Sequence, residues 1–586
     1  MSTSSEQARA LEHRAATEKE DEEAGVVAHP RQHMPDWKWK GAFGVFVLTS
    51  VISDRGVITH TPLLLPGYDV SNVANIQPRL YEAFGNIKLL PWIGLSYSLA
   101  NFAVLSFARK ITYCFDLRYV YLFHMVIFLV GAVVAGAAKN LTSIIVGRVI
   151  MGWGGSVVQQ TNFSYLAVLA TPAEMPGKFA LMSAMWAVGL VIGGPIGSAF
   201  AENPNATWRW AFYLNLPLVG LGLILGIICV PSHSLARDIP VLQRLARMDP
   251  VGVLFNMAAP ILFAIAVTFS GPIWAWGWGA SIAAWVVFGV VFAAWILQQH
   301  FCVLTTPEER AFPMHMLPRL DLLPIWIASG CSGAAYAVTL YYIPLFFAFA
   351  RGHGAMEQTV RMLPFILVFI VIVLCTGAAL PVVGRYKIIY IIAGSATLAG
   401  AAAMAATMDS NVSEAQVMGL EALIGVGLGM HFQHGLGISN VINKDNPRAR
   451  VDSSIICNMV QMGGIAVVLA LAGCIFQNVG FDLLAGAVGT ADYTEQDLRE
   501  ALAGVSSVVW QTRDPDVVAR GIEAVTEVIA DEFYIVVASG ALCLLCALCM
   551  KGEKLDYGRK KNVEQQEREG KGQETQGPKQ AESDSA

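Results

Sequence analysis

Arg148 is a charged residue in the middle of an apolar stretch, IIVGRVIMGWGG. A central arginine costs about 2.5 to 3.5 kcal/mol to place in a bilayer, so it should face protein or water and bind a partner. The best carboxylate for that role is Asp69, in GYDVSNVANIQP. A buried acid paired with a base can change its protonation when its neighbours move, as proton coupling requires. The alternatives are a purely structural ion pair for Arg148 and a loop position near the outer surface for Asp69.

A second polar group lies in the apolar stretch EALIGVGLGMHFQHGLGISN and contains Glu421, His431 and His434. The histidines are three residues apart, so one continuous helix would place them on roughly one face. A metal site needs more ligands than this, and no metal is predicted. Contact with a substrate and a hydrogen bond within the core both fit these residues. Other apolar stretches contain aromatic residues that could line a cavity for a flat or apolar ligand: Trp153, Trp186, Tyr336 and Tyr341.

The stretch GLVIGGPIGS, residues 189–198, places four glycines and a proline within an apolar segment: Gly189, Gly193, Gly194, Pro195 and Gly197. Gly189 and Gly193 form a GxxxG pair, which lets the backbone of a neighbouring helix come close. Pro195 removes a backbone donor and favours a kink. These residues predict a packed hinge or a seal, and ordinary helix packing is the alternative.

Other classes of chemistry find little support. The sequence contains no GxxxxGK[ST] phosphate loop, because Gly177 and Lys178 are followed by Phe179 and lack the upstream glycine. The serines and histidines are scattered, which argues against a membrane hydrolase. The ten cysteines lie mostly in apolar segments, where a free cysteine behaves as a small hydrophobe. The sequence therefore predicts no enzyme, no cofactor and no nucleic-acid partner.

The elements that position these residues are predicted to be membrane-spanning helices. Of the 586 residues, 55% are hydrophobic and 14% are charged, against about 25% charged in soluble domains. Apolar runs of about 20 residues recur from Gly41 to Met550, and each is long enough to cross the bilayer. Residues 1–36 and 551–586 are polar and are predicted to be disordered tails. The fold class is an all-α polytopic membrane protein.

Fourteen spans are predicted: one starting near Gly41, then 89–107, 119–138, 144–169, 179–200, 210–230, 251–270, 281–297, 322–349, 362–383, 388–406, 417–441, 455–476 and 533–550. An even number places both termini on one side. If that side is cytosolic, the inner loops hold fourteen Lys and Arg residues and the short outer loops six, in agreement with the positive-inside rule. The outer loops then contain three N-glycosylation sequons, at Asn140, Asn205 and Asn411.

Several motifs follow one another in a known order, and the chain from Trp37 to Met550 resembles fourteen-span drug:proton antiporters of the major facilitator superfamily, particularly fungal toxin and siderophore transporters. The glycines of 189–198 match the antiporter motif of the fifth span, read in that family as a seal associated with export. Pro195 lies one step later than usual. GRVIMGWGG matches the fourth-span motif, whose arginine, here Arg148, is implicated in proton transfer. Residues 203–218 and 84–100 resemble the family's next connection and its second-span entrance.

Two departures from the family pattern concern the amino-terminal half. The loop after the second span usually reads Gly-Lys-x-x-Asp, whereas ARKITYCFDLRYVYL has Tyr113 about where the acid belongs. Asp116 and Arg118 are the candidate substitutes in the gating ion pair. Asp69 and Ser71 match the family's first-span Asp-x-Thr, but charged residues precede them. Residues 51–67 are therefore predicted to be an insertion or a gene-model artefact.

The resemblance implies the major facilitator fold with 6+2+6 helices: an amino-terminal bundle at 37–231, a linker with two extra spans at 232–298, and a second bundle at 299–550 that includes an outer loop at 478–531. It implies proton-coupled export of a small organic compound, such as a toxin, secondary metabolite or drug. Siderophore uptake by the same fold is the alternative, and a non-transporting sensor a further one. We expect a monomer in the plasma membrane with both termini cytosolic, whose partners are protons, a small-molecule substrate and the lipid bilayer.

Overall fold

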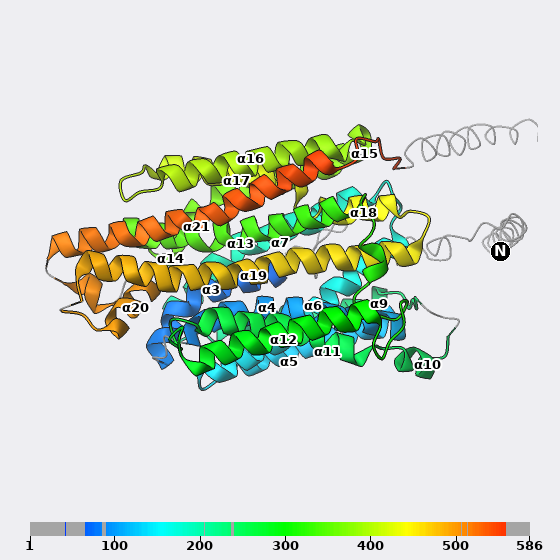
Figure 1. Cartoon of the computed structure of the whole chain (residues 1–586), viewed down its shortest axis with the longest axis horizontal. Coiled ribbons are helices and arrows are strands. Elements are labelled where there is room, and N and C mark those ends of the chain that lie inside the picture. Colours follow the sequence, from blue (N-terminus) through cyan, green and yellow to red (C-terminus); the bar gives the residue numbers. More distant parts are fainter. Residues whose placement is uncertain are drawn as a thin grey trace, which may run out of the picture.

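The computed structural model describes Ala42 and residues 65–84, 89–203, 205–235, 239–490, 492–504, 507–512 and 514–557, and the named elements in these ranges are all helices (Figure 1). Twelve of the described helical segments are long and apolar enough to cross a membrane. Two further helices, α3 and α4, contain 20 and 25 residues and pack with them. The chain is thus an all-α polytopic membrane protein, and the count of fourteen spans, with which this fold is consistent, stays a prediction.

The amino-terminal bundle contains α3 to α9. Its close helix pairs are α3 with α7, α4 with α6, and α5 with α6. The helices are α3 (Leu65–Phe84), α4 (Leu90–Cys114), α5 (Leu117–Gly136), α6 (Leu141–Leu169), α7 (Met175–Glu202), α8 (Trp210–Tyr213) and α9 (Asn215–Cys229). The linker follows with α10 (Val241–Ala246), α11 (Pro250–Phe269) and α12 (Gly279–Phe301).

The carboxy-terminal bundle contains the remaining helices, in which α13 and α16 pack on α21, and α13 packs on α19. They are η2 (Met314–Met316), α13 (Leu323–Arg351), α14 (Ala355–Arg361), α15 (Leu363–Val383), α16 (Tyr386–Thr407), α17 (Glu414–His431), α18 (His434–Ile442), α19 (Pro447–Val488), α20 (Glu495–Ala503), η3 (Val508–Gln511) and α21 (Pro515–Cys549). The two bundles meet where α7 contacts α15 and α18, and where α19 contacts α4 and α6.

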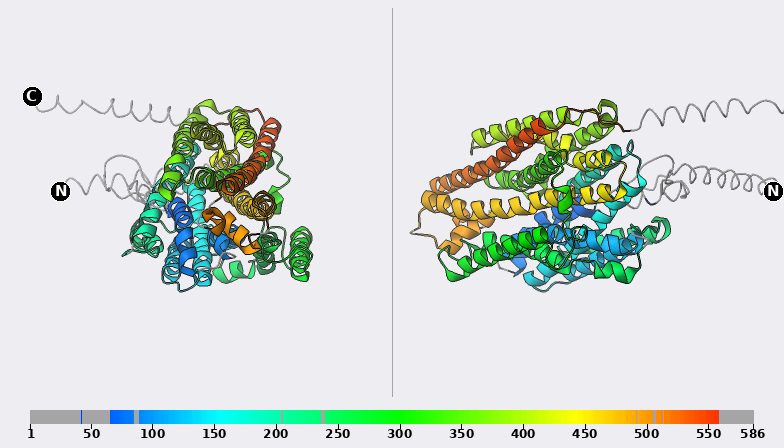
Figure 2. Two further views of the ribbon diagram at one scale, coloured as in Figure 1. Left: turned by 90° about the vertical axis from the view of Figure 1, so that its left-hand side faces the viewer. Right: turned by 45° about the vertical axis from the view of Figure 1, so that its right-hand side comes forward.

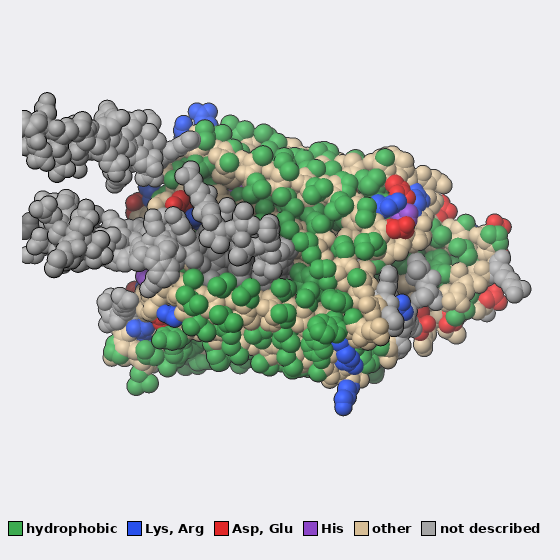
Figure 3. Space-filling view, turned by 180° about the vertical axis from the view of Figure 1, so that it is seen from behind, with side chains coloured by type: hydrophobic (Ala, Val, Ile, Leu, Met, Phe, Trp, Pro, Cys, Tyr) green, Lys and Arg blue, Asp and Glu red, His purple; other side chains and the backbone are tan. Residues whose placement is uncertain are grey.

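The helices run along the long axis of the molecule and define two ends (Figures 1 and 2). We call the end with α10 and α18 the inner end, because its loops are those predicted to be cytosolic. The outer end carries α14 and α20. Hydrophobic side chains cover the middle of the face shown in Figure 3, and charged side chains gather toward the ends. Such an apolar band is what a bilayer of about 30 Å hydrocarbon thickness requires.

Three predicted boundaries differ from the structure. The predicted span 417–441 is divided, because α17 ends at His431 and α18 begins at His434. The carbonyl of Phe432 in this break accepts a hydrogen bond of 2.6 Å from Gln461 Nε2, which satisfies a backbone group that the interrupted helix leaves free. The two histidines therefore lie on separate helices and do not share one helical face.

The outer connection predicted for 478–531 is shorter in the structure, since α19 runs to Val488 and α21 begins at Pro515. Hydropathy marks only the part of a helix that crosses the hydrocarbon, whereas both helices continue beyond it. Leu484 of α19 and Val528 of α21 are buried there, as is Leu502 of α20, which packs on α19. Most of the suggested insertion, 51–67, lies outside the described residues. Its last three residues form the first turn of α3, so the helix that carries Asp69 begins within it.

Candidate functional site

Asp69 and Arg148 form a buried ion pair between α3 and α6. The guanidinium Nη1 of Arg148 contacts Asp69 Oδ2, and the two side chains are 1% and 0% exposed. Arg148 Nε also donates a hydrogen bond of 3.1 Å to the carbonyl of Ile93 on α4. The guanidinium lies over the ring of Tyr97, 4.7 Å from its centroid. The partner expected for Arg148 from the sequence is the one in contact with it, and three helices meet at this pair.

One carboxylate oxygen of Asp69 lies outside the contact with Arg148. Asp69 Oδ1 is buried and has no hydrogen-bond partner among the described residues. Two charges removed from water attract each other strongly, but loss of either leaves an uncompensated buried charge, at a cost of about 3 to 5 kcal/mol. Neutralising either side chain would therefore be expected to weaken this contact between α3 and α6.

The position of Asp69 depends on close contact between α3 and α7. A Cβ atom on Gly193 would lie 2.5 Å from the carbonyl oxygen of Tyr68, and one on Gly197 would lie 2.6 Å from Asn72 Oδ1. In the other direction, a Cβ on Gly67 would lie 2.0 Å from the carbonyl oxygen of Trp186. No side chain fits at these distances, so glycine is required on both helices. The 189–198 stretch thus sets the backbone on either side of Asp69.

The other residues of this stretch are part of the same helix. Gly189 and Gly194 are buried, and α7 continues through Pro195 to Glu202. Nearer its inner end, α7 contacts the second bundle, where a Cβ on Gly377 would lie 2.3 Å from the Ala180 side chain. α7 therefore lies between α3 and the carboxy-terminal bundle, as a seal between the bundles would.

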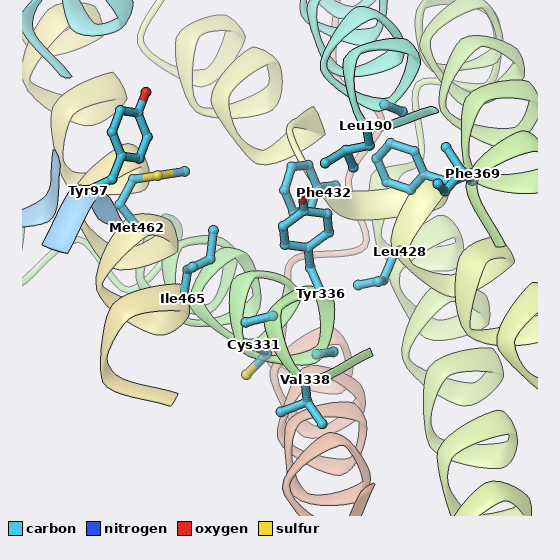
Figure 4. Close-up of a cluster of buried hydrophobic side chains, with 14 of the residues drawn as sticks. Tyr97, Leu190, Cys331, Tyr336, Val338, Phe369, Leu428, Phe432, Met462 and Ile465 are labelled. Carbon is cyan, nitrogen blue, oxygen red and sulfur yellow. The ribbon is translucent and has the colours of Figure 1, made fainter. Parts of the chain in front are cut away.

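Aromatic side chains meet where α7 faces the second bundle. Trp186 Nε1 donates a hydrogen bond of 2.8 Å to the hydroxyl of Tyr336 on α13. The Tyr336 ring centroid lies 5.2 Å from that of Phe432, which lies 5.5 Å from that of Phe369. Figure 4 shows these three rings together with Leu190. Two of the four aromatic residues noted in the sequence meet here, whereas Trp153 packs on Phe107 and Tyr341 on Tyr342.

At the inner end an ion pair joins the bundles, and the sequence did not indicate it. Arg109 Nε on α4 lies 2.8 Å from Asp452 Oδ1 on α19, and both side chains are at most 3% exposed. The Tyr113 hydroxyl donates to the same oxygen at 3.3 Å. His315 Nε2 lies 3.6 Å from the other oxygen, beside a cavity of about 260 Å³ that Arg448 also lines. Arg109 and Tyr113 belong to the altered loop ARKITYCFD, but nothing in that loop points to Asp452, 343 positions away.

The family model described as Major Facilitator Superfamily matches residues 63–241. The chain is 30% identical over 514 residues to the efflux pump DEP3 of Fusarium langsethiae, covering 87% of this chain and 89% of that one. It is also 30% identical to the efflux pump patC of Aspergillus clavatus, covering 83% and 88%. The chain belongs to the Major Facilitator Superfamily. It is a multi-pass membrane transport protein and not an enzyme.

A solved structure has the same fold. The human organic anion transporter MFSD10 (TETRAN) aligns with a TM-score of 0.50 at 12% identity, covering 88% of this chain and 100% of that chain. At this identity the likeness concerns the fold alone. The shared fold agrees with the arrangement of this chain in two helical bundles.

The polar residues of the twelfth predicted span, 417–441, do not converge in this superfamily member. Glu421 is buried in α17, and neither of its carboxylate oxygens has a hydrogen-bond partner among the described residues. His431 Nδ1 lies 2.7 Å from the carbonyl of Gly427 in its own helix. His434 is buried near Gly377, so it faces the contact with α7. Within the described residues, no group of three or more His, Cys, Asp or Glu side chains could hold a metal ion.

Asp116 and Arg118, the candidate gating residues, make their contacts within the amino-terminal half. Asp116 caps α5, accepting a hydrogen bond of 2.8 Å from the Arg118 backbone N–H and another from the Ser232 hydroxyl. The Arg118 side chain donates to the carbonyl of Ile227 on α9. Neither side chain belongs to an ion pair among the described residues. The ion pair that joins the bundles is instead that of Arg109 with Asp452, because the Arg109 side chain faces α19.

The three sequons lie on exposed turns. Asn140 caps α6, Asn205 follows α7, and Asn411 lies between α16 and α17; all three residues are exposed. Each is near the outer end, so each is accessible to a modifying enzyme on that side. Glycosylation at these positions stays a prediction.

Proposed function

We propose that this superfamily member exports a small amphipathic organic compound from the cytosol in exchange for protons. The observation that carries the proposal is the buried ion pair of Asp69 and Arg148, with one carboxylate oxygen unpartnered among the described residues. Protonation of Asp69 would remove the attraction that holds α3 to α6. A proton bound there is thereby coupled to helix packing, which is the condition for proton-driven transport.

The direction and the cargo are inferred from two further features. α7, with its glycines packed on α3, also contacts the second bundle, and relatives that cover most of the chain are named efflux pumps. The aromatic cluster around Tyr336 offers flat apolar surfaces and one hydroxyl at the interface between bundles, where transporters of this architecture bind substrate. Both support export of an aromatic or amphipathic compound, such as a fungal toxin or secondary metabolite.

Alternating access requires that the bundles part at one end at a time. The Arg109–Asp452 ion pair closes the inner end and must break when that end opens. The distribution of Lys and Arg assigns the inner end to the cytosol. We place the protein in the plasma membrane as a monomer with both termini cytosolic.

Inside-out membrane vesicles test this function. With an acidic lumen, vesicles containing the chain should accumulate the fluorescent aromatic cation rhodamine 6G or a candidate metabolite, and a protonophore should abolish the accumulation. Vesicles with Arg148→Ala serve as the control. Ferric siderophore accumulation by intact cells that depends on this chain would replace export by uptake, and no flux of either kind under any gradient would favour a sensor.

A further inference from the structure

We propose that the two linker spans hold the inner ion pair in place and that Asp249, at the start of α11, is the positioning residue through which they act. This assigns a task to α11 and α12, which belong to neither bundle. It rests on the proposed function in so far as the ion pair opens and closes during transport. The path runs from Asp249 through the segment 309–312 to Arg109.

Asp249 is the centre of a fully satisfied hydrogen-bond network. It is 3% exposed, and each of its carboxylate oxygens accepts two hydrogen bonds. Oδ1 accepts from Gly252 N at 2.9 Å and from Gln298 Nε2 at 3.0 Å. Oδ2 accepts from Gln299 Nε2 at 3.0 Å and from Ala311 N at 2.8 Å. Capping α11 needs only the first of these bonds. The other three join the start of α11 to the end of α12 and to the segment that follows it.

That segment is held at three consecutive residues. Besides Ala311, the backbone N–H of Phe312 donates 3.1 Å to Gln299 Oε1. Arg310 Nη1 donates 2.8 Å to the carbonyl of Gln299. With its amide groups and one side chain tied to α12 and Asp249, the segment has a fixed backbone, and its carbonyl groups point elsewhere.

Those carbonyl groups hold Arg109. Its Nη1 donates to the carbonyl of Arg310 at 2.8 Å and to that of Ala311 at 3.3 Å, while its Nε lies 2.8 Å from Asp452. The adjacent Lys110 Nζ donates to the carbonyl of Glu309. The Arg109 guanidinium thus bonds to the segment 309–312, which is tied to the linker helices, and to Asp452 on α19 of the second bundle.

The physical reason for such a support is the cost of fixing a long side chain. An arginine loses much of its rotamer freedom on burial, and a buried ion pair is favourable only with good geometry and satisfied donors. The carbonyls of 310 and 311 satisfy donors that Asp452 does not reach. α11 also contacts both α4 and α19, and Ser106 on α4 donates to Asn256 on α11. The linker therefore touches both helices that carry the ion pair.

The test uses a cysteine beside the ion pair. Ser453 is buried on α19, next to Asp452, and its hydroxyl has no partner among the described residues, so Ser453→Cys is a mild change. The full-length protein in lipid nanodiscs is treated with a water-soluble maleimide, and alkylation at position 453 is followed by peptide mass spectrometry. Asp249→Ala and Arg109→Ala should each increase the rate about tenfold, as expected for loss of hydrogen bonds to a charged group.

The double variant decides the mechanism. If Asp249 acts through Arg109, Asp249→Ala together with Arg109→Ala should be no faster than Arg109→Ala alone, because coupled residues are not additive. Gln299→Ala removes the side chain that links Asp249 to Phe312 but leaves the Asp249 cap of α11 in place. It should also raise the rate of alkylation at position 453. Asp514→Ala removes the aspartate cap of α21 at the outer end and serves as the matched control, with an unchanged rate.

Additive effects of the two variants, or unchanged protection in both Asp249→Ala and Gln299→Ala, would overturn the proposal. The assay needs neither substrate nor a gradient. Coupling between Asp249 and Arg109 without any flux in vesicles would therefore refute proton-driven export and leave this inference standing.

Discussion

Trp186 on α7 and Tyr336 on α13 are joined by a hydrogen bond of 2.8 Å that crosses from one bundle to the other. The residues come from separate halves of the chain, 150 positions apart. Apolar and aromatic side chains lie near Tyr336, including Leu190 and Phe432 (Figure 4). This hydrogen bond joins the two bundles at one point of their interface. If the bundles separate as proposed, the same indole and hydroxyl groups would be available to a substrate.

Replacing either partner of this bond should change substrate affinity. Trp186→Phe and Tyr336→Phe each remove one hydrogen-bonding group, worth about 0.5 to 1.5 kcal/mol net, so KM for rhodamine 6G in vesicles should shift about two- to tenfold. Trp153→Phe is the matched control, because the Trp153 indole N–H is buried without a partner among the described residues. An equal shift in the control would mean that the aromatic cluster around Tyr336 does not bind the compound.

Arg148→Ala should abolish proton-coupled flux while surface expression remains. The variant leaves Asp69 buried without its cation, so the acid should be held protonated and unable to release a proton. Asp69→Asn should also abolish coupling, but it should retain downhill exchange of substrate, since the amide cannot titrate. Flux measured with and without a pH gradient separates the two steps. Unchanged gradient-driven flux in Arg148→Ala would show that the pair is only structural.

Gly193→Leu should arrest transport or let protons leak. Even a Cβ at this position would lie 2.5 Å from the backbone of Tyr68, so α7 must move away from the helix that carries Asp69. Gly220→Leu, on α9 of the same bundle, has nothing within 4 Å of its Cβ and should transport normally. Proton leak is measured by the decay of an imposed pH gradient in vesicles. A wild-type rate in Gly193→Leu would reduce the 189–198 stretch to ordinary packing.

The sequence was sufficient for the fold and for the pairing of Asp69 with Arg148. A buried arginine needs a carboxylate partner. The apolar segments contain few Asp and Glu residues, so the composition leaves few candidate partners for Arg148. The helix break before His434 could not be predicted in this way. The polar residues at the break, His431 and His434, occur in an otherwise apolar run that reads as one span, and what permits the break is a glutamine on α19 that bonds to the freed carbonyl.

The inner ion pair was missed for a related reason. Arg109 and Asp452 lie 343 positions apart, and nothing local in either segment points to the other. The loop motif drew attention to Asp116 and Arg118, whose charges suggested a pair, but their side chains turn toward the Ser232 hydroxyl and the Ile227 carbonyl. Which charges meet depends on how the bundles dock, and a pattern within one loop does not contain that information.

The Asp321–Arg319 pair should make the folded protein less stable at acidic pH. Arg319 donates two hydrogen bonds to it, from Nε at 2.9 Å and from Nη2 at 2.7 Å, and these bonds lower the pKa of the Asp321 carboxyl below its ordinary value of 3.8. Because the folded-state pKa is lowered, the stabilisation is present above the unfolded-state pKa and is lost as pH falls through the folded-state pKa. The melting temperature of the wild type should therefore fall more steeply below about pH 4 than that of Asp321→Asn.

The expected difference is small, since the Arg319 side chain is 41% exposed and water screens the pair. Arg319→Gln should flatten the same part of the pH profile as Asp321→Asn, and the double variant should add nothing further. Thermal unfolding of the full chain in detergent, followed at pH 3 to 7 for all four proteins, measures these differences. Identical slopes in the wild type and Asp321→Asn would mean that this pair, just before α13, contributes nothing to the stability of the second bundle.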